Sequence, residues 1–492
     1  MSGVKNYLAF DFGASSGRAI LGKLHEGKLE LEEIHRFSND PVEINGHYYW
    51  DTFRLFYEIK QGLIKYAQGN YGPLEGVGID AWGVDFGLIG PSGELLGVPY
   101  HYRDSRTDGM MEEADKLMGR RRIFDESGIS HEFFNTVNQL LAMVKQDSPA
   151  LKYAKHLLFI PDLFDYFLTG EVGTEFCEAT TSQLVNPVTR TWSDEILKNL
   201  GIPRGIFTDI QYPGTLRGRL LPSIQQETGL GAVPVYAVAS HDTNSASAAV
   251  PAKGDSWAFL SSGTWSLLGI EVDKPVVNDT TYNYNYTNEG AVGGRYNLLK
   301  NIMGMWIIQQ LRADWERRGE KYSFGELVKL AEGAQPFKAF INPDDSLFVP
   351  PVDMDKRIMQ YCERTNQQVP KTKGEILRCA YESLALKYRQ AIEGLEEITG
   401  KKIDTLHIVG GGCQNAMLNQ MTANSTNRRV VTGPVEGTAI GNLLVQAMAA
   451  GEIKDIQELR SVVAASFPNE IYQPEEKETW DKAYEAYKKV TI

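Results

Sequence analysis

A short polar run, SHDTN at residues 240–244, follows an apolar stretch at residues 235–239 that is typical of a buried strand. A carboxylate at the end of a sheet strand can accept the proton of an alcohol that attacks a terminal phosphate. His241 and Thr243 could then hydrogen-bond to neighbouring hydroxyl groups, although a single histidine is more often structural. Asp242 could equally be the N-cap of a following helix, because the next residues are small. From this segment alone both interpretations stay open.

Two turns rich in glycine and serine could bind phosphate. The first, GASSG at residues 13–17, lies between two apolar stretches, a pattern that predicts a strand, a turn and a second strand. Its residues carry no bulky side chain, so its backbone N–H groups could approach an oxyanion closely. Alone, such a turn is more often only a hairpin connection. A similar turn, SSGT at residues 261–264, follows about half a chain later, and two such turns could grip a nucleoside triphosphate between domains.

Two further features could take part in nucleotide binding. Asp11 directly precedes the first turn, where its carboxylate could bind a metal ion through water. Three glycines at residues 410–412 follow the apolar run LHIV and precede a helix predicted to begin near Asn415. The missing Cβ atoms could leave a flat surface for a base or a ribose, and a tight strand-to-helix turn is the alternative. Neither the dinucleotide spacing GxGxxG nor the motif GxxxxGK[ST] is present here.

A third group of residues suits a sugar. Trp82 and Asp85 flank Gly83 in the run AWGVDF, and the run YRDSR at residues 102–106 adds further polar groups. Aromatic faces stack on the C–H faces of a polyhydroxylated sugar, while charged groups bind its hydroxyls. Salt-bridged loop structure is the alternative for residues 104 and 106. The run KNIMGMWIIQ at residues 300–309 is predicted to enter a helix, in which Asn301 and Gln309 are the polar exceptions.

The elements that must position these residues alternate between strand-like and helical patterns, which is typical of an α/β fold. A chain of 492 residues is too long for one hydrophobic core, and its repeated hairpin design indicates two similar domains. We expect one domain at residues 1–248, with the sugar site, the first phosphate turn and Asp242. The other, at residues 249–492, would carry the second turn and the three glycines. Helical periodicity appears at residues 380–395 and 441–450, and a terminal surface helix is expected after Pro474.

Composition narrows the class of partner. The formal charge of -13 gives no electrostatic reason to bind nucleic acid or an anionic membrane, so a small molecule is expected. We find no apolar run of membrane-spanning length and no pattern of a cleaved leader, and we expect a soluble protein. Four cysteines without CxxC spacing argue against a zinc site and a secreted disulfide framework, and favour the reducing cytoplasm. Cys362 and Cys379 could pair, but two free, packed thiols are expected.

Taken together, these motifs resemble those of the FGGY carbohydrate kinases, within the superfamily of sugar kinases, actin and Hsp70. The matching segments occur in order over nearly the whole chain, at residues 12–18, 81–86, 102–107, 239–243, 260–266, 287–290, 299–304 and 407–415. The phosphate turns match the superfamily, whereas WGVDF, HDT and KNIMG are more specific. The resemblance implies two actin-like (ribonuclease H-like) domains with a nucleotide and sugar cleft between them.

The resemblance is strongest to members that act on L-rhamnulose. It implies transfer of the γ-phosphate of ATP to the 1-hydroxyl of L-rhamnulose, in L-rhamnose catabolism, with Asp242 as the catalytic proton acceptor. The implied ketose-binding positions are Gly83, His241, Asp242, Thr243 and Asn301. The implied ATP-binding positions are Ala14, Ser15, Ser16, Gly17, Arg18, Thr264, Gln309 and Gly411. A divalent ion, usually Mg²⁺, would bridge the phosphates near Asp11 and Asp242. Some relatives carry a close cysteine pair that residues 421–425 lack, which bears on redox behaviour only.

Two alternatives remain. A kinase for another ketose or polyol, such as L-fuculose, xylulose or glycerol, would carry the same motifs, because spacing does not encode hydroxyl stereochemistry. An actin-like or Hsp70-like ATPase would hydrolyse ATP without a sugar. The polar groups at Trp82 and Asp85 and at residues 241–243 argue against it, because a pure ATPase needs no second polar pocket beside the γ-phosphate. The expected partners are therefore L-rhamnulose and ATP, with no nucleic acid and no membrane, for a monomer or homodimer.

Overall fold

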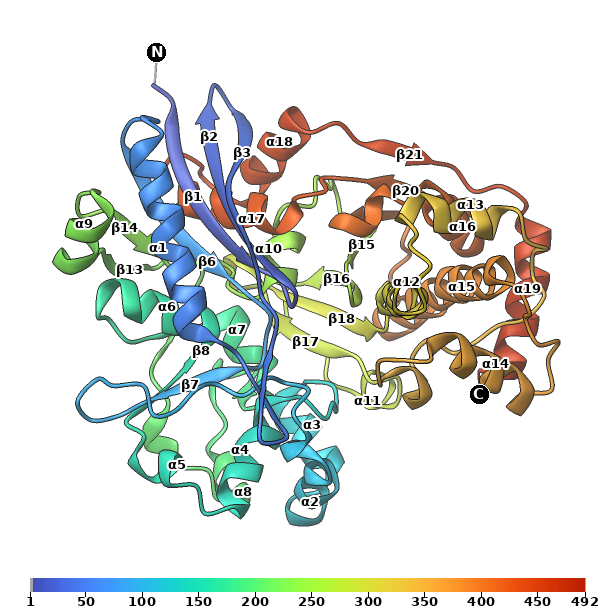
Figure 1. The fold of residues 1–492 in the computed structure, drawn as a ribbon, viewed down its shortest axis with the longest axis horizontal. Coiled ribbons are helices and arrows are strands. Elements are labelled where there is room, and N and C mark those ends of the chain that lie inside the picture. Colours follow the sequence, from blue (N-terminus) through green and yellow to red (C-terminus); the bar gives the residue numbers. More distant parts are fainter. Residues whose placement is uncertain (1–2, 492) are drawn as a thin grey trace. The chain divides into compact units, whose positions relative to one another are not determined.

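The fold is described from a computed structural model, in which residues 3–491 are described (Figure 1). Their contacts divide the chain into two compact units, each made of separate chain segments. Unit 1 contains the chain up to Pro251, Glu271–Leu298 and Gly437–Phe467. Unit 2 contains Ala252–Ile270, Leu299–Glu436 and the chain from Pro468 onward. The division between residues 248 and 249 stays a prediction.

Unit 1 is built on a six-stranded sheet with the order β13-β14-β6-β1-β2-β3. Its strands are β1 (Lys5–Phe12), β2 (Ser16–His25), β3 (Lys28–Ser38), β6 (Leu74–Asp80), β13 (Leu216–Arg219) and β14 (Pro234–Tyr236). Strands β1, β6 and β14 run parallel to one another, whereas β2, β3 and β13 pair antiparallel to their neighbours. The hairpin predicted around residues 13–17 is confirmed, since that turn joins β1 to β2.

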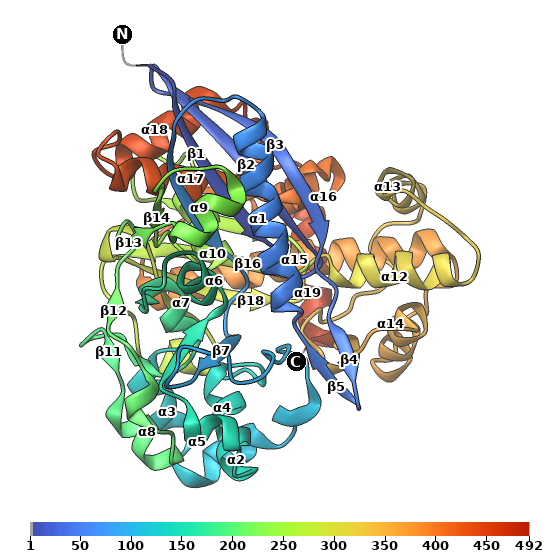
Figure 2. The same ribbon diagram turned by 60° about the vertical axis from the view of Figure 1, so that its left-hand side comes forward.

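The central strand β1 is buried on both faces, because helices cover the sheet on each side. Leu8 and Phe10 belong to a core that includes residues of α1, α6 and α9. Tyr7 and Ala9, which alternate with them along the strand, belong to a core with residues of α10, α17 and α18. Figures 1 and 2 show α1 running along one face of the sheet. The helices are α1 (Thr52–Gln68), α6 (Ile160–Thr169), α9 (Pro222–Thr228), α10 (Asp242–Ala248), α17 (Gly437–Ala449) and α18 (Ile456–Ser466).

The helices α10 and α17 meet at a glycine. A Cβ atom on Gly441 of α17 would lie 1.9 Å from the backbone oxygen of Ser245 in α10, so only glycine allows this approach. After Gly441, α17 places two polar side chains over the sheet. Asn442 donates to Asp80 over 2.6 Å, and Gln446 donates to the backbone oxygen of Leu8 over 3.1 Å. The helix predicted at residues 441–450 is therefore tied to the strands that carry Asp11 and Asp80.

A second core of unit 1 lies around the short strands β7 and β8, which pair antiparallel. Its elements are β7 (Phe86–Ile89), β8 (His156–Phe159), α2 (Met110–Leu117), α3 (Arg120–Ser127), α4 (Thr136–Lys145), α5 (Pro149–Tyr153) and α8 (Asp194–Leu200). The remaining elements of unit 1 are β4 (Val42–Ile44), β5 (His47–Tyr49), β9 (Thr174–Glu175), β10 (Val185–Asn186), β11 (Thr191–Trp192), β12 (Ile210–Gln211), β17 (Thr287–Gly290), α7 (Phe176–Thr181) and α11 (Asp279–Asn283).

Unit 2 repeats the strand pattern of unit 1. Its strands follow the order β18-β16-β15-β19-β20-β21, with β15 antiparallel to β16 and parallel to β19. They are β15 (Trp257–Ser262), β16 (Ser266–Val272), β18 (Tyr296–Ile302), β19 (Thr405–Val409), β20 (Arg429–Thr432) and β21 (Glu470–Tyr472). Residues 271–272 of β16 and 296–298 of β18 belong to the segment assigned to unit 1. The helices are α12 (Trp306–Arg317), α13 (Phe324–Glu332), α14 (Met354–Arg364), α15 (Lys373–Thr399), α16 (Ala416–Thr426) and α19 (Lys477–Val490).

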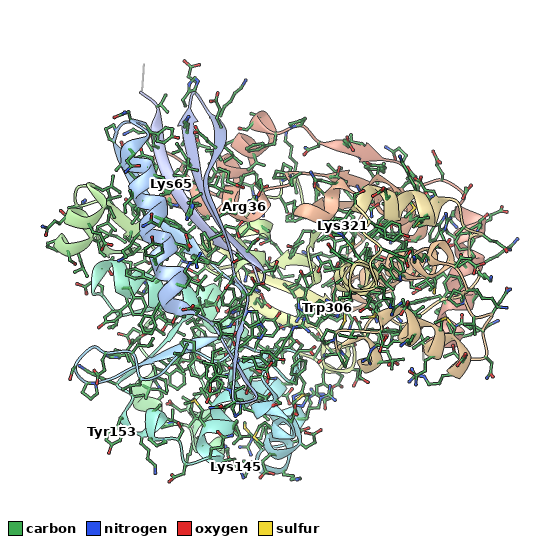
Figure 3. The ribbon with its side chains drawn as sticks, viewed as in Figure 1. Arg36, Lys65, Lys145, Tyr153, Trp306 and Lys321 are labelled. Atoms are coloured by element: carbon green, nitrogen blue, oxygen red, sulfur yellow. The ribbon has the colours of Figure 1, made fainter. Side chains whose placement is uncertain are left out.

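Several local predictions can be compared with these elements. The helix at residues 380–395 is confirmed inside α15, whose first turn is fixed by a capping box of Thr372 and Glu375. The helix after Pro474 exists, but it is not purely a surface helix, since Trp480 and Tyr487 are buried. The prediction that residues 300–309 form one entry into a helix is wrong in its first part. Residues 300–302 end strand β18, and α12 begins only at Trp306, whose indole Nε1 donates to the backbone oxygen of Phe348 (Figure 3).

Two whole-chain expectations concern membranes and thiols. Among residues 3–491, no helix combines the length and apolar character needed to cross a membrane.

All four cysteines are buried free thiols, as expected. A hydrogen bond from the Cys379 thiol lowers the pKa of Cys362, so the two sulfur atoms are neighbours without being bonded.

Replacing Gly441 by Val should destabilise the protein by about 1–3 kcal/mol or more, because the new side chain forces α17 away from α10. Denaturant unfolding of the whole chain measures this loss. Gly325→Ala is the matched control: it also adds a Cβ to a helical glycine, but nothing lies within 4 Å of that position, so equal or slightly higher stability is expected. Equal stability of both variants would contradict the close approach at Gly441.

Candidate active site

Asp242 is the first residue of α10, where the chain leaves the sheet of unit 1. Its backbone N–H donates to the oxygen of Ala81 over 2.8 Å, and Ala81 donates to the oxygen of Ser240 over 2.9 Å. The parallel pairing of β14 with β6 is thereby extended to the residue before the helix. The N-cap position belongs to His241 and not to Asp242, so the alternative that Asp242 is only a cap is not supported. Its side chain remains 34% exposed.

Three carboxylates meet where the parallel strands end. Asp11 near the end of β1 and Asp80 at the end of β6 are register partners, and Asp242 follows the next strand. Burial and the charge of Asp11 raise the pKa of Asp80 well above its usual range. Burial also raises the pKa of Asp242, and the charge of Asp11 adds to this, although His241 opposes it. A raised pKa makes Asp242 a stronger base than an exposed aspartate.

The His241 side chain is fixed by Glu289 of β17. The His241 Nδ1 atom lies 2.8 Å from Glu289 Oε2, and the same oxygen accepts a hydrogen bond from Asn244 over 3.1 Å. The other ring nitrogen, Nε2, lies 3.5 Å from Asp242 Oδ1. Burial disfavours the imidazolium, but the carboxylates of Glu289 and Asp242 outweigh it and raise the pKa of His241 to about 9. The ring is therefore a cation at neutral pH and lies beside Asp242.

Gly83 begins a strained turn. Val84 has a φ of 71°, a rare backbone angle for a β-branched residue, and the Asp85 N–H donates to the Gly83 oxygen over 3.0 Å. The turn is held because Thr181 accepts from the Val84 N–H over 3.0 Å. Thr181 also explains the glycine, since a Cβ atom at Gly83 would lie only 3.0 Å from the threonine methyl carbon. Backbone strain of this kind is concentrated at functional sites.

The aromatic and acidic residues near Gly83 differ from expectation in one respect. Asp85 is fully buried and does not face a ligand. Its carboxylate accepts hydrogen bonds from the indoles of Trp50 and Trp82, over 2.6 and 3.0 Å, and from the side chain of Gln139 over 2.9 Å. Asp85 is therefore an internal anchor for the Trp50–Trp82 stack, whose ring centroids are 3.9 Å apart. Sequence spacing placed it beside a sugar because it cannot distinguish the two sides of a turn.

The first phosphate turn presents free backbone amides. Within residues 3–491, the N–H groups of Ala14 and Ser15 donate no hydrogen bond, whereas the Gly13 N–H closes the turn onto the Ser16 oxygen over 2.9 Å. Gly17 is required by packing, since a Cβ there would lie 2.2 Å from the ring of Phe37. Arg18 forms a 2.5 Å ion pair with Asp11, 19% and 8% exposed respectively. The turn thus joins unpaired N–H groups to a cation, which suits an oxyanion.

The second phosphate turn, in unit 2, is built alike. The Gly263 N–H donates to the Trp265 oxygen over 2.9 Å, and the Thr264 N–H finds no acceptor among the described residues. The Thr264 hydroxyl donates to Gln309 Oε1 on α12 over 3.3 Å, so these two predicted ATP-binding residues are neighbours. Asn301, the second-last residue of strand β18, is half-buried.

The three glycines after β19 differ in what surrounds their Cβ positions. A Cβ atom on Gly412 would lie 2.0 Å from the Ser262 hydroxyl oxygen, and one on Gly410 would lie 3.0 Å from the Ser262 backbone oxygen. These two glycines serve the tight turn that precedes α16, which begins at Ala416 with Asn415 as its N-cap, close to the predicted start near Asn415. Gly411 is exposed, and nothing lies within 4 Å of its Cβ position. Gly411 is therefore the one of the three whose missing side chain leaves an open surface.

Two acidic residues of this region, Glu289 and Asp80, were not among the site residues predicted from the sequence. Glu289 lies in a segment that matched the family, but no feature of that segment indicated its contact with His241. Asp80 had a local signal, because a carboxylate interrupts an otherwise apolar strand at residues 76–81. Its Oδ2 accepts from Asn442, which is 362 positions away, and its Oδ1 has no hydrogen-bond partner among the described residues.

The acidic groups fit a divalent cation in part. Within residues 3–491, no three His, Cys, Asp or Glu side chains form a complete metal site. Mg²⁺, however, is commonly bound by one or two carboxylates together with substrate phosphates. Asp11, Asp80 and Asp242 supply hard oxygen donors whose mutual repulsion a cation would relieve, and Asp80 keeps one unpartnered oxygen. The donor chemistry therefore suits Mg²⁺ that arrives with a nucleotide.

Replacing Glu289 by Gln should reduce the pH dependence of stability. The pKa of His241 rises from 6.5 to about 9 on folding, so its stabilising charge is fully present below pH 6.5 and lost as pH rises through about 9. We expect the wild type to lose a few kcal/mol more than Glu289→Gln between pH 6.5 and 9.5, measured by denaturant unfolding. Glu271→Gln is the control, because it removes the charge of another glutamate with a buried side chain, one that pairs with Arg460 instead of a histidine. An unchanged pH dependence in Glu289→Gln would exclude this pair as its source.

The sequence and fold were compared with known proteins. The family model described as the FGGY family of carbohydrate kinases matches residues 6–249 with its N-terminal domain and residues 258–450 with its C-terminal domain. A curated rhamnulokinase of Bacteroides thetaiotaomicron is 45% identical over 484 residues, which are 98% of this chain and 99% of that protein. A curated rhamnulokinase of Halalkalibacterium halodurans is 43% identical over 474 residues, 96% of this chain and all of that protein.

Solved structures agree on the fold. The crystal structure of gluconate kinase from Lactobacillus acidophilus matches with a TM-score of 0.83 at 17% identity, over 99% of this chain and 97% of that chain. At such low identity the likeness concerns the fold alone. It confirms the predicted α/β class with two actin-like domains. With both family domains and full-length relatives matched, the chain belongs to the FGGY family of carbohydrate kinases.

Proposed function

We propose that this protein transfers the γ-phosphate of ATP to the 1-hydroxyl of L-rhamnulose, giving L-rhamnulose 1-phosphate and ADP. The observation that carries the proposal is Asp242: a partly exposed carboxylate with a raised pKa, at the joint ends of three parallel strands, beside a charged histidine. A purely structural aspartate at a helix start would be expected to cap the helix, and this one does not. The choice of sugar follows the names of the full-length relatives.

In this mechanism Asp242 orients the 1-hydroxyl and takes its proton as the oxygen attacks the terminal phosphate. His241 donates a hydrogen bond from Nε2 to a hydroxyl group of the ketose, while Glu289 fixes the ring by its contact with Nδ1. Thr243 donates its hydroxyl to Asp242 Oδ1 over 3.1 Å, which keeps that carboxylate oriented. Gly83 and Asn301 complete the proposed ketose-binding set. The cationic His241 also favours the ionised form of Asp242, the form that can accept a proton.

The nucleotide is proposed to bind through both phosphate turns. Residues 14–18 offer the free amides of Ala14 and Ser15 together with Arg18, and Thr264 offers a third free amide. Backbone N–H groups of this kind stabilise phosphate oxygens as charge shifts during transfer. Gln309 supports the Thr264 hydroxyl, and Gly411 offers the open surface proposed for the adenosine. When bound, Mg²⁺ would neutralise phosphate charge, and Asp11 and Asp242 are the residues proposed to hold it.

We also propose that the protein is cytoplasmic, because a reaction that consumes ATP and a catabolic sugar suits that compartment. We propose that it is a monomer or a homodimer. Both alternatives from the sequence are open to direct test, since other ketose or polyol kinases differ in the preferred acceptor and an ATPase needs none.

Mass spectrometry of the product from ATP and L-rhamnulose tests the proposal itself. We expect one ketose monophosphate carrying the phosphate on carbon 1, with ADP release that depends on the sugar. ADP release should be slower with L-fuculose, xylulose and glycerol. Equal rates with all four acceptors would contradict the assignment to L-rhamnulose, and ADP release without any sugar would favour the ATPase.

Asp242→Asn should lower kcat by about a hundredfold or more, because an amide cannot accept the hydroxyl proton. The fold should stay intact, since the backbone contacts with Ala81 do not involve the side chain. Asp194→Asn serves as the control for the loss of one carboxylate, because Asp194 is 84% exposed on α8. Wild-type turnover in Asp242→Asn would remove this residue from the mechanism.

Gly411→Leu should raise the KM for ATP by about tenfold or more and leave the melting temperature nearly unchanged. The leucine covers the surface proposed for adenosine, and nothing in the folded chain lies within 4 Å of its Cβ position. Gly412→Ala should instead lower the melting temperature, because its Cβ would strike Ser262, and should change the KM for ATP less. A normal KM for ATP in a folded Gly411→Leu protein would place the adenosine elsewhere.

A further inference from the structure

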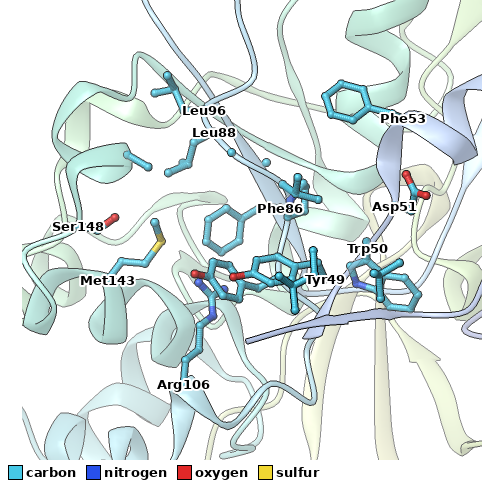
Figure 4. A pocket seen from close by; sticks show the side chains of 18 residues that line it. Tyr49, Trp50, Asp51, Phe53, Phe86, Leu88, Leu96, Arg106, Met143 and Ser148 are labelled. Carbon is cyan, nitrogen blue, oxygen red and sulfur yellow. The ribbon is translucent and has the colours of Figure 1, made fainter. Parts of the chain in front are cut away.

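Unit 1 contains a cavity of about 570 Å³ that none of the proposed sugar-binding or ATP-binding residues lines. Figure 4 shows it between the segment that enters α1, the strand β7 and the helix α4. Its wall is mainly aromatic and aliphatic, with Tyr49, Trp50, Phe86, Tyr100 and Met143 among the lining side chains. A volume of this size with an apolar wall is typical of a site for a small organic molecule.

One cation lies in this apolar wall. Arg106 lines the cavity and is only 9% exposed, yet it forms no ion pair with any residue from 3 to 491. Its Nη2 donates to the neutral side chain of Gln139 over 2.6 Å, and its Nε is buried without an acceptor. Gln139 separates it from the buried Asp85, to which the same amide donates over 2.9 Å. Burial lowers the pKa of Arg106 to about 10, so the guanidinium keeps its charge at neutral pH.

A buried guanidinium without a carboxylate in contact is energetically unfavourable, and an anion in the cavity would remove part of that cost. The only carboxylate in the cavity wall is Asp51, and it already accepts from the Arg54 N–H as the N-cap of α1. Asp104 accepts from the backbone N–H of Arg106 and not from its side chain. The charge on Arg106 is thus left for a ligand.

The shape around Arg106 favours a flat ligand. The guanidinium carbon lies 3.9 Å from the ring centroid of Tyr100, which in turn lies 4.6 Å from the ring of Tyr49. The two rings are tilted by 38° and offer aromatic faces next to the guanidinium. Arg106 can bind a carboxylate through two N–H groups in one plane. Apolar side chains at the rim are exposed, with Ile44 at 52% and Phe53 at 62%. The helices α4 and α5 lie on the side of the cavity opposite Phe53 (Figure 4). Their residues Lys145 and Tyr153 are labelled in Figure 3.

We propose that this cavity binds a small monocarboxylate with a flat apolar body, the carboxylate pairing with Arg106 and the body lying between Tyr49, Phe86 and Met143. A sugar is a poor match, because the wall offers few polar groups for its hydroxyls. The cavity is therefore a second ligand site, with chemistry opposite to that of the proposed ketose site.

The test uses the whole protein and two matched probes, 2-naphthoate and 2-naphthalenemethanol, which share the ring system and differ in charge. Trp50 lines the cavity, so ligand binding is read from tryptophan fluorescence and confirmed by isothermal titration calorimetry. We expect 2-naphthoate to bind with one site per chain and more tightly than the alcohol. Arg106→Met should raise the dissociation constant of 2-naphthoate at least about tenfold and leave that of the alcohol nearly unchanged.

Two further variants separate a lost site from a damaged fold. Arg103→Met removes a neighbouring arginine that does not line the cavity, and 2-naphthoate binding should persist. Ala150→Trp fills the cavity from α5 without touching the arginine, and both probes should then lose affinity. Equal affinity of Arg106→Met and wild type for 2-naphthoate would overturn the proposal. So would equal binding of the two probes to the wild type, or an absence of saturable binding.

Discussion

The parallel backbone pairing between Ala81 and residues 240–242 is the constraint on which the site depends. Two hydrogen bonds, from Ala81 to Ser240 and from Asp242 to Ala81, carry the sheet past the last regular residue of β14 and release the chain into α10. The carboxyl ends of parallel strands meet at one sheet edge, so Asp242 is brought to Asp11 and Asp80 without any side-chain contact being needed. Main-chain geometry thus positions the proposed catalytic base, and α17 packs against its helix through the close approach at Gly441.

The acidic character of this edge requires compensation, and the fold provides it from different segments. Arg18 pairs with Asp11, Asn442 donates to Asp80, and His241 faces Asp242. Because each of these partners neutralises or binds a different oxygen, the three carboxylates can stay close while Asp242 alone remains partly exposed. Burial, together with the charge of Asp11, still raises the pKa values of Asp80 and Asp242, as expected at a site proposed to bind a cation and a phosphate.

The surroundings of glycines and of buried charged residues distinguish positions that the packing requires from positions that are open to a ligand. Gly17 and Gly412 are required because a Cβ would strike a neighbour, whereas Gly411 faces open space. Asp85 and Arg106, which resemble each other as buried charged residues, also differ: the carboxylate is saturated with donors, while the guanidinium keeps an unpartnered nitrogen beside a cavity. An unsatisfied buried group indicates a ligand more strongly than burial or charge alone.

The sequence by itself determined the α/β class, the two hairpins with their turns of glycine and serine, the helix after Asn415 and the family, because these follow from local periodicity and short motifs. It also singled out Asp242, but could not decide between a base and an N-cap. Only the tertiary structure assigned the N-cap to His241, and only it revealed the buried position of Asp85, the strand at residues 300–302 and the contact of Glu289 with His241. The reason is physical: side-chain direction at a turn and pairing between distant segments depend on packing, and residues such as Asp80 and Asn442 meet only when the sheet and α17 have assembled.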